Sequence, residues 1–301
     1  MLIIYHKADL DGICSGAIFH RKFPEARLLG YDYREPFDAE EQIAKGEDVI
    51  MADVSMPMLT MEAIADRAGS FVWIDHHVSA YQDFVSHFKF QLSDCSGYQV
   101  MYADGYDWEY MYEPTLSACE LCWEYVSSDE MPESVELLGS YDVWRRDGTE
   151  KWNDVILPFQ YGMRQRGFTP EKLAEFIGHE STSIVERIIE HGRMVLNYQK
   201  QQDERLMLKS FDARLNIPAE NGIIRCLVCN GAYNSTAFES KWDEEKYDAM
   251  VGITYDGKMW GISLRTTKDI DLSVIAKSFG GGGHAKAAGC GVDDLRKILI
   301  W

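Results

Sequence analysis

The sequence lacks any long apolar run. No window approaches the roughly 18 consecutive apolar residues that a membrane-spanning helix requires, and the first residues, MLIIYHKADLDG, contain no basic leader of the kind that begins a signal peptide. These absences predict a cytoplasmic protein with no membrane partner.

Cysteine and basic residues are also scarce. The seven cysteines are odd in number and lie in apolar segments, which favours reduced thiols over a disulfide framework. The 30 Lys and Arg residues face 49 Asp and Glu, so the net charge is −19. This charge argues against a long duplex as ligand, because nonspecific nucleic-acid binding depends on many cationic contacts to phosphate. A small phosphorylated ligand stays open, since local cations or bound metals can outweigh the overall field.

What is present fits a globular α/β protein of more than one domain. The chain has 301 residues, of which 46% are hydrophobic. Its first 80 residues alternate apolar runs with helical periodicity. The predicted strands are MLIIYH, ARLLGYDY, DVIMADVS and SFVWIDHH, and the helices between them are GAIFHRKF, AEEQIAKG and MLTMEAIADRAG. This alternation predicts a parallel sheet with helices on both faces, in which ligands collect beyond the carboxyl ends of the strands.

The rest of the chain predicts more helices and a second, smaller α/β domain. Residues 90–113 have little clear period, and we expect a loop or an irregular insertion there. Helices are predicted at TLSACELCWEYV, ESVELLGSYDVW and PEKLAEFI, and a long charged helix at 181–211. IIRCLVCN, AMVGITYD and KMWGISLRT follow as strands, the last two forming a hairpin, and DLSVIAKSF as a helix. The expected parts are a first domain over 1–180, a linker helix over 181–212 and a second domain over 213–301.

Acidic and imidazole side chains gather at the ends of the predicted strands. They are His6, Asp9, Asp11, Asp53, Asp75, His76 and His77. Taken singly, each group is ordinary, because acidic turns after strands are common and a single histidine is usually a satisfied polar residue. Together, carboxylates converging on one crevice would repel one another unless a cation lay between them. Mixed Asp and His ligands suit manganese, iron or zinc.

This set contains enough ligands for two metal ions that share one carboxylate. Two metals about 4 Å apart support in-line displacement at phosphorus, because their charge stabilises the crowded phosphoryl oxygens and the leaving oxygen. The sequence therefore predicts a hydrolytic metal centre.

The motifs HKADLDG, MADVS, WIDHH, GSYDVW and GGGGHAKAAG, in this order, resemble the DHH phosphoesterase family with its C-terminal DHH-associated (DHHA1) domain. The resemblance spans both ends of the chain. The HxxDLDG opening and the SACEL helix are most similar to the nanoRNases, the oligoribonucleases of this family that degrade very short RNA. Residues 96–113 depart from the family pattern and look like an insertion, which leaves the substrate rim undefined.

The resemblance implies roles for individual residues. One manganese ion would be held by His6, Asp9 and Asp53, and a second by Asp11, Asp53, His76 and Asp142. His77 would face the scissile phosphate, and Asp75 would orient the centre without binding metal directly. Read without the family, Asp142 could pair with Arg145 or Arg146, and the favoured reading would be a helix cap.

The segment GGGGHAKAAG is the second motif with a predicted role. Its glycines permit close backbone approach and expose N–H groups that could bind an anion, although a flexible linker is the simpler reading. The resemblance implies that this segment binds the terminal phosphate or nucleotide of the substrate together with an arginine. The predicted substrate-binding residues are Arg265, Gly281, Gly282, Gly283 and His284.

Two further patterns each have a structural alternative. Cys119 with Cys122, and Cys226 with Cys229, form CxxC pairs, but one pair lies on a predicted helix and the other on a strand, where residues three apart point to opposite faces. We therefore expect core packing rather than a zinc site. The aromatic residues of 98–112 could stack nucleobases or pack against the sheet, and both readings stay open.

The expected function is that of a phosphodiesterase with two divalent metal ions, most simply manganese. It would hydrolyse short RNA to mononucleotide 5′-phosphates. Alternatives are a phosphatase of small nucleotides such as 3′-phosphoadenosine 5′-phosphate, a cyclic- or linear-dinucleotide phosphodiesterase, a RecJ-type exonuclease and, outside enzymes, a nucleotide-binding regulator. A homodimer is left open.

Overall fold

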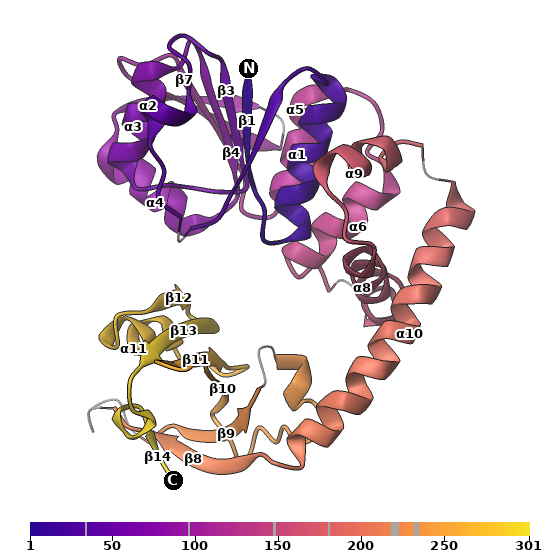
Figure 1. The fold of residues 1–301 in the computed structure, drawn as a ribbon, viewed down its shortest axis with the longest axis vertical. Coiled ribbons are helices and arrows are strands. Elements are labelled where there is room, and N and C mark those ends of the chain that lie inside the picture. Colours follow the sequence, from indigo (N-terminus) through magenta and orange to yellow (C-terminus); the bar gives the residue numbers. More distant parts are fainter. Residues whose placement is uncertain (34, 96, 147–148, 180, 218–222, 232–234) are drawn as a thin grey trace. The chain divides into compact units, whose positions relative to one another are not determined.

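The computed structural model describes residues 1–33, 35–95, 97–146, 149–179, 181–217, 223–231 and 235–301. The chain divides into two compact units, Met1–Val195 and Leu196–Trp301, and each unit contains a seven-stranded sheet (Figure 1). The predicted partition into 1–180, 181–212 and 213–301 stays a proposal. None of the helices in the described ranges is both long and apolar enough to span a lipid bilayer.

The sheet of the first unit has the strand order β2-β1-β3-β4-β7-β6-β5. The strands are β1 (Leu2–His6), β2 (Arg27–Tyr31), β3 (Val49–Ala52), β4 (Phe71–Asp75), β5 (Phe90–Cys95), β6 (Tyr98–Ala103) and β7 (Trp108–Tyr112). The predictions of β1 to β4 are confirmed, and these four strands pair in parallel.

The prediction of a loop or irregular insertion over 90–113 is wrong. These residues form β5, β6 and β7; β7 pairs in parallel with β4, whereas β6 and β5 continue the sheet in antiparallel fashion. Alternate aromatic residues of β7 are buried: Trp108, Tyr110 and Tyr112. Aromatic residues suit a pleated, half-buried surface, and Tyr110 stacks on Trp73 with 3.8 Å between ring centroids. These aromatic residues therefore pack the core, and the sheet is mixed rather than wholly parallel.

Helices cover both faces of this sheet, as the sequence predicts (Figure 1). On one face lie α2 (Ala39–Gln42), α3 (Met58–Arg67) and α4 (Val78–His87). The other face carries α1 (Leu10–Lys22), α5 (Ala118–Val126), α6 (Glu133–Asp142), α8 (Leu157–Arg166) and α9 (Pro170–Phe176). The helical segment formed by α7 (Thr149–Lys151), a π-helical turn (Trp152–Ile156) and α8 was not predicted.

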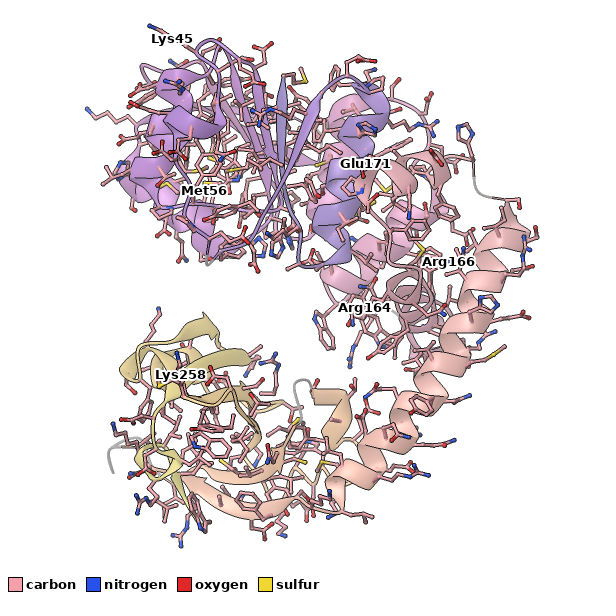
Figure 2. The ribbon with its side chains drawn as sticks, viewed as in Figure 1. Lys45, Met56, Arg164, Arg166, Glu171 and Lys258 are labelled. Carbon is pink, nitrogen blue, oxygen red and sulfur yellow. The ribbon has the colours of Figure 1, made fainter. Side chains whose placement is uncertain are left out.

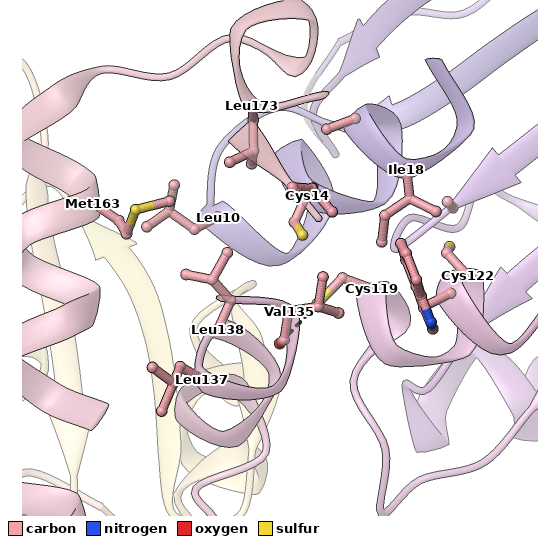
Figure 3. Packing of buried hydrophobic residues seen from close by; sticks show 14 of the residues in the cluster. Leu10, Cys14, Ile18, Cys119, Cys122, Val135, Leu137, Leu138, Met163 and Leu173 are labelled. Atoms are coloured by element: carbon pink, nitrogen blue, oxygen red, sulfur yellow. Dashed lines mark hydrogen bonds between the residues drawn. The ribbon is translucent and has the colours of Figure 1, made fainter. Parts of the chain in front are cut away.

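The core on the second face is formed by α1 and the helices that pack around it (Figure 3). Cys14, Cys119 and Cys122 are buried there as free thiols among Leu, Ile and Val side chains. The Cys119 thiol lies 3.8 Å from the carbonyl oxygen of Val135, as a weak hydrogen bond between α5 and α6. Packing of these helices fixes the ends of α1 and α6, which carry the candidate site residues Asp11 and Asp142.

The long helix α10 (Thr182–Met207) leads into the second unit, whose sheet has the order β12-β13-β11-β10-β9-β8-β14. Its strands are β8 (Phe211–Leu215), β9 (Arg225–Asn230), β10 (Ala249–Tyr255), β11 (Trp260–Arg265), β12 (Gly282–His284), β13 (Ala287–Val292) and β14 (Leu299–Ile300), and its helix is α11 (Leu272–Ser278). The β10–β11 hairpin is confirmed. Strands β8 and β14 were not predicted, and α10 ends at Met207, before the expected residue 211.

The two cysteines of β9 lie on opposite faces of this sheet. Cys226 packs in the core that contains Val228 and α11, whereas Cys229 packs with Met207 and Phe238. Side chains three residues apart on a strand must point apart. The geometry agrees with core packing of both thiols.

Candidate metal centre

The predicted strand-end residues lie along one edge of the first sheet. Strands β1, β3 and β4 are parallel neighbours, with Tyr5 opposite Ala52 and Ala52 opposite Ile74. The residues that follow Tyr5, Ala52 and Ile74 are His6, Asp53 and Asp75, so all three side chains lie at the same edge of the sheet. In Figure 1 this edge is at the end of β1 away from the N-terminus.

Three groups of candidate ligands form at this edge, and within each group the ligand atoms lie within 4.8 Å of one another. The groups are His6, Asp9 and Asp53; Asp11, His76 and Asp142; and Asp53, Asp75, His76 and His77. The eight side chains predicted from the sequence as metal-binding or catalytic are thus gathered in space.

Asp53 links the first two groups. Its Oδ2 lies 3.5 Å from His6 Nδ1, which itself lies 2.9 Å from Asp9 Oδ2. Its other oxygen, Oδ1, lies 3.7 Å from His76 Nε2. His76 Nε2 is also 3.2 Å from Asp142 Oδ2 and 3.8 Å from Asp11 Oδ2. One carboxylate therefore presents an oxygen to each group.

Asp53 is also strained and buried. It is 2% exposed, and its backbone has a φ of +60°, a region that L residues seldom adopt. Burial, together with the charges of Asp11 and Asp9, raises the pKa of Asp53 well above its usual range. Within the described ranges Oδ2 has no hydrogen-bond partner. Strain and an unsatisfied buried oxygen at one residue are typical of a functional site.

Asp11 is held by a helix that begins far along the chain. Its Oδ2 and Oδ1 accept hydrogen bonds from the backbone N–H groups of Ala118 (2.9 Å) and Cys119 (2.8 Å), 107 and 108 residues away. These are the first N–H groups of α5, where the helix dipole favours an anion. The contact fixes the orientation of the Asp11 carboxylate. This contact was not predicted from the sequence, although the capping box at Ser117 and Glu120 marks this helix start.

Gly12 allows α1 to start directly beside the end of β1. A Cβ at this position would lie 2.1 Å from the carbonyl oxygen of His6, so only glycine fits. Its N–H donates to the Asp9 carboxylate at 3.0 Å, which caps the helix. The glycine of the HKADLDG motif therefore determines how closely His6, Asp9 and Asp11 approach one another.

Asp142 is the last residue of α6, so it does not cap a helix N-terminus. A negative charge at a helix C-terminus is unfavourable, and α6 has no basic residue in its last turn. Burial, with the nearby charges of Asp11 and Asp9, raises the pKa of Asp142 to about 8. The Arg145 side chain pairs with Glu120 at 2.8 Å. A cation bound nearby would stabilise a carboxylate at this buried helix C-terminus.

His77 is oriented by Asp75. Asp75 Oδ1 lies 2.7 Å from His77 Nδ1 and also accepts the backbone N–H groups of His76 (2.8 Å) and His77 (3.3 Å). Burial alone would lower the pKa of His77, but the Asp75 carboxylate raises it to about 9. Burial lowers the pKa of His76. The two adjacent imidazoles therefore differ, with His76 suited to bind metal as a neutral ligand and His77 to carry a proton.

The donor set fits divalent metal. Carboxylates and neutral imidazole are ligands that manganese, iron and zinc accept, and the unsatisfied Asp53 Oδ2 has the partner it lacks once a cation binds. Tyr33, which sequence reasoning missed, packs edge-on against His6 with 5.3 Å between ring centroids and is 48% exposed. It forms one wall beside the His6 group.

The predicted substrate-binding residues lie in the second unit. Gly282, Gly283 and His284 form β12, which pairs with β13 as a hairpin rather than an open loop; the His284 side chain is outside the described part of the structure. Gly281 donates its N–H to Ala276 O at 2.9 Å, and a Cβ there would lie 2.1 Å from Gly289 O. Arg265 is half-buried and its guanidinium donates to Leu264 O. Their substrate role stays a prediction.

Comparisons with known proteins agree with this architecture. Residues 235–299 match the DHHA1 domain. The chain is 23% identical to Oligoribonuclease NrnB of Bacillus subtilis (strain 168), over 98% of this chain and 73% of that protein. The chain thus resembles the DHH phosphoesterases. These enzymes hydrolyse phosphoester bonds, which is the chemistry that a pair of divalent metals supports.

Two further proteins are distantly similar to this chain. An uncharacterised protein of Acanthamoeba polyphaga mimivirus is 23% identical over 85% of this chain and 55% of its own length. The solved structure of PggH, a pGpG-specific phosphodiesterase from Vibrio cholerae, superposes with a TM-score of 0.52 at 12% identity, covering 97% of this chain and 92% of that one. The similarity to PggH is a similarity of fold.

Proposed function

We propose that this protein is a manganese-dependent phosphodiesterase that hydrolyses short oligonucleotides to mononucleotide 5′-phosphates. The observation that carries the proposal is Asp53, which presents one oxygen to His6 and the other to His76. In this proposal His6, Asp9 and Asp53 hold one ion, and the second is held by Asp11, Asp53, His76 and Asp142. Bound metal would activate water and neutralise phosphoryl charge.

The protein's own groups have separate tasks in this reaction. The Asp75 carboxylate holds Nδ1 of His77, which leaves Nε2 of His77 for the substrate. A protonated His77 beside the scissile phosphate would stabilise negative charge on the phosphoryl oxygens. The first N–H groups of α5 orient the Asp11 carboxylate. Of these groups, His77 is the one that would place positive charge beside the reacting phosphate, while Asp75 and the α5 N-terminus hold their partners in position.

The size of the substrate follows from charge and from the relatives. A net charge of −19 opposes a long polyanion, and the names of NrnB and PggH assign those proteins an oligoribonucleotide and a dinucleotide substrate. Short RNA is thus the substrate class that agrees with both. We further propose that Arg265 and the 281–284 segment bind the end of that substrate.

A substrate panel tests the proposal. The protein is incubated with Mn²⁺ and RNA or DNA of about two to twenty residues, linear and cyclic dinucleotides, and 3′-phosphoadenosine 5′-phosphate, and products are resolved by length. The proposal expects the highest kcat/KM on the shortest RNAs, with loss of activity in Asp53→Asn and His77→Ala. Highest activity on the bisphosphate or on long DNA would favour those alternatives. No turnover of any substrate, with binding retained, would favour a regulator.

A further inference from the structure

The residue after the C-cap of α6 is a tryptophan in a conformation that favours glycine. Trp144 has a φ of +53°. Its N–H donates to Tyr141 O at 3.3 Å, and the N–H of Arg145 donates to Ser140 O at 2.9 Å, which is the Schellman pattern that commonly ends a helix with glycine. Among the described residues only Asp53 and Trp144 are non-glycine residues with positive φ. A strained residue that persists beside a reactive centre is a candidate for function.

Trp144 is the exposed end of an aromatic stack. Its ring lies 5.5 Å from that of Trp152 with an interplanar angle of 18°, and Trp152 lies 5.7 Å from Tyr141 at 8°. Trp152 is 5% exposed, whereas Trp144 is 53% exposed. The buried tryptophan therefore supports an indole that keeps about half of its surface open.

Two arginines stand at this stack although the chain is strongly acidic. The Arg146 guanidinium lies 4.4 Å from the Trp144 ring centroid and 4.7 Å from that of Trp152. Figure 2 labels Arg164, which lies on α8. Its guanidinium is 5.2 Å from the centroid of the Tyr141 ring. Both arginines are exposed, and no described carboxylate forms an ion pair with either. Exposed aromatic rings beside cations are the surface that single-stranded nucleic acid binds.

The stack adjoins the candidate metal centre along the backbone. Trp144 is two residues beyond Asp142, whose Oδ2 lies 3.2 Å from His76 Nε2. The two Cα atoms are therefore no more than about 7.6 Å apart. A nucleotide whose phosphate reached the metal-binding carboxylates would have its neighbour within reach of the indole.

We propose that Trp144 and Arg146 form a nucleotide subsite next to the scissile phosphate. A base of the single-stranded substrate stacks on the open surface of Trp144, and Arg146 pairs with an adjoining phosphate. The inference rests on the proposed function, because it deepens the substrate class of the same site. The subsite explains why a tryptophan occupies this strained backbone position. Glycine would end α6 with less strain, but it has no ring on which a base could stack.

Abasic substrates test the stacking. RNA trimers with one base removed at each position in turn are hydrolysed by the wild type, Trp144→Ala and Trp144→Phe. Loss of one stacked base lowers affinity roughly 5- to 150-fold, so Trp144→Ala should lose kcat/KM by such a factor on the intact trimer. On the trimer that lacks the stacked base, wild type and Trp144→Ala should be equal. Trp144→Phe should retain most activity, and Tyr198→Ala, which removes an exposed tyrosine of α10, should match the wild type.

Stability separates binding from a structural role. Trp144→Gly relieves the positive φ, so it should fold with a midpoint temperature at or near that of the wild type while losing the same factor in kcat/KM. Arg146→Gln should reduce the salt dependence of the trimer affinity. The control is Arg166→Gln, at an exposed arginine on the same helix as Arg164, which should leave that salt dependence unchanged.

Two results would overturn the subsite. One is an unchanged kcat/KM in Trp144→Ala; the other is an equal loss on all three abasic trimers. If the wild type cleaves no trimer, the proposed function fails. The subsite is then judged by trimer binding, measured by fluorescence anisotropy with Ca²⁺ in place of the catalytic metal, and equal binding by wild type and Trp144→Ala would reject it. Loss of self-association in Trp144→Ala without loss of binding would instead assign the indole to a protein contact.

Discussion

Asp142→Asn should stabilise the metal-free protein while weakening its metal binding. In the fold, burial and the charges of Asp11 and Asp9 raise the pKa of Asp142 from its ordinary 3.8 to about 8. A pKa that is higher in the folded state contributes stability below the ordinary pKa, and this contribution is lost as the pH rises towards 8. Asparagine has the same shape and no such titration.

The size of the effect follows from the two pKa values. At pH 7 the unfolded chain has Asp142 ionised, so folding must take up a proton, and each pH unit above the ordinary pKa costs about 1.4 kcal/mol. This sets an upper limit of about 4 kcal/mol. Because neighbouring carboxylates share the repulsion, we expect about 2 to 4 kcal/mol. In a domain of this size that corresponds to a rise of roughly 4 to 16 °C in midpoint temperature.

Thermal unfolding in EDTA, followed from pH 4 to pH 9, measures this difference. The wild type should lose stability relative to Asp142→Asn as the pH rises to about 8, after which the gap should stay constant. Added Mn²⁺ should reverse the order, because ligand that binds only the folded state stabilises it by mass action. Asp83→Asn, at an exposed position of α4, is the control and should follow the wild type. A less stable Asp142→Asn in EDTA, or equal stabilisation of both proteins by Mn²⁺, would refute the reasoning.

Three other substitutions test separate features. Gly12→Ala places a Cβ 2.1 Å from the carbonyl oxygen of His6, at the end of β1. Calorimetry should therefore show weaker Mn²⁺ binding, and denaturant unfolding should show a free energy of unfolding lower by several kcal/mol. Unchanged Mn²⁺ binding would contradict the close approach of α1 to β1. Tyr110→Ala should lower unfolding free energy by about 3 to 5 kcal/mol yet leave trimer affinity of the folded protein unchanged. Arg225 lowers the pKa of Asp248, so this carboxylate stabilises the fold above its ordinary pKa, and the stabilisation decreases as the pH falls from about 4 towards the lowered pKa. The destabilisation by Asp248→Asn should therefore shrink steadily below about pH 4; a gap that stays constant as the pH falls from about 4 to about 2 would contradict this pairing.

Local pattern sufficed to predict the strands that carry the candidate site. β1, β3 and β4 are apolar runs bounded by polar residues, and parallel neighbours end at one edge of a sheet. For that reason His6, Asp53 and Asp75 could be expected to meet before any coordinates were known. The same pattern logic failed for 90–113, because the buried aromatic residues of β7 are separated by Glu109 and Met111, one polar and one apolar, so the segment shows no clear period of two.

Only the tertiary structure decided how the distant residues join this edge. That Asp142 caps no helix N-terminus depended on where α6 ends, and Asp11 meets the α5 N-terminus across 107 residues. Nothing in the sequence marks Trp144, since glycine is the residue expected where a helix ends with positive φ. Hydrophobic periodicity reports which face of an element is buried, whereas these contacts depend on how whole helices pack against the sheet.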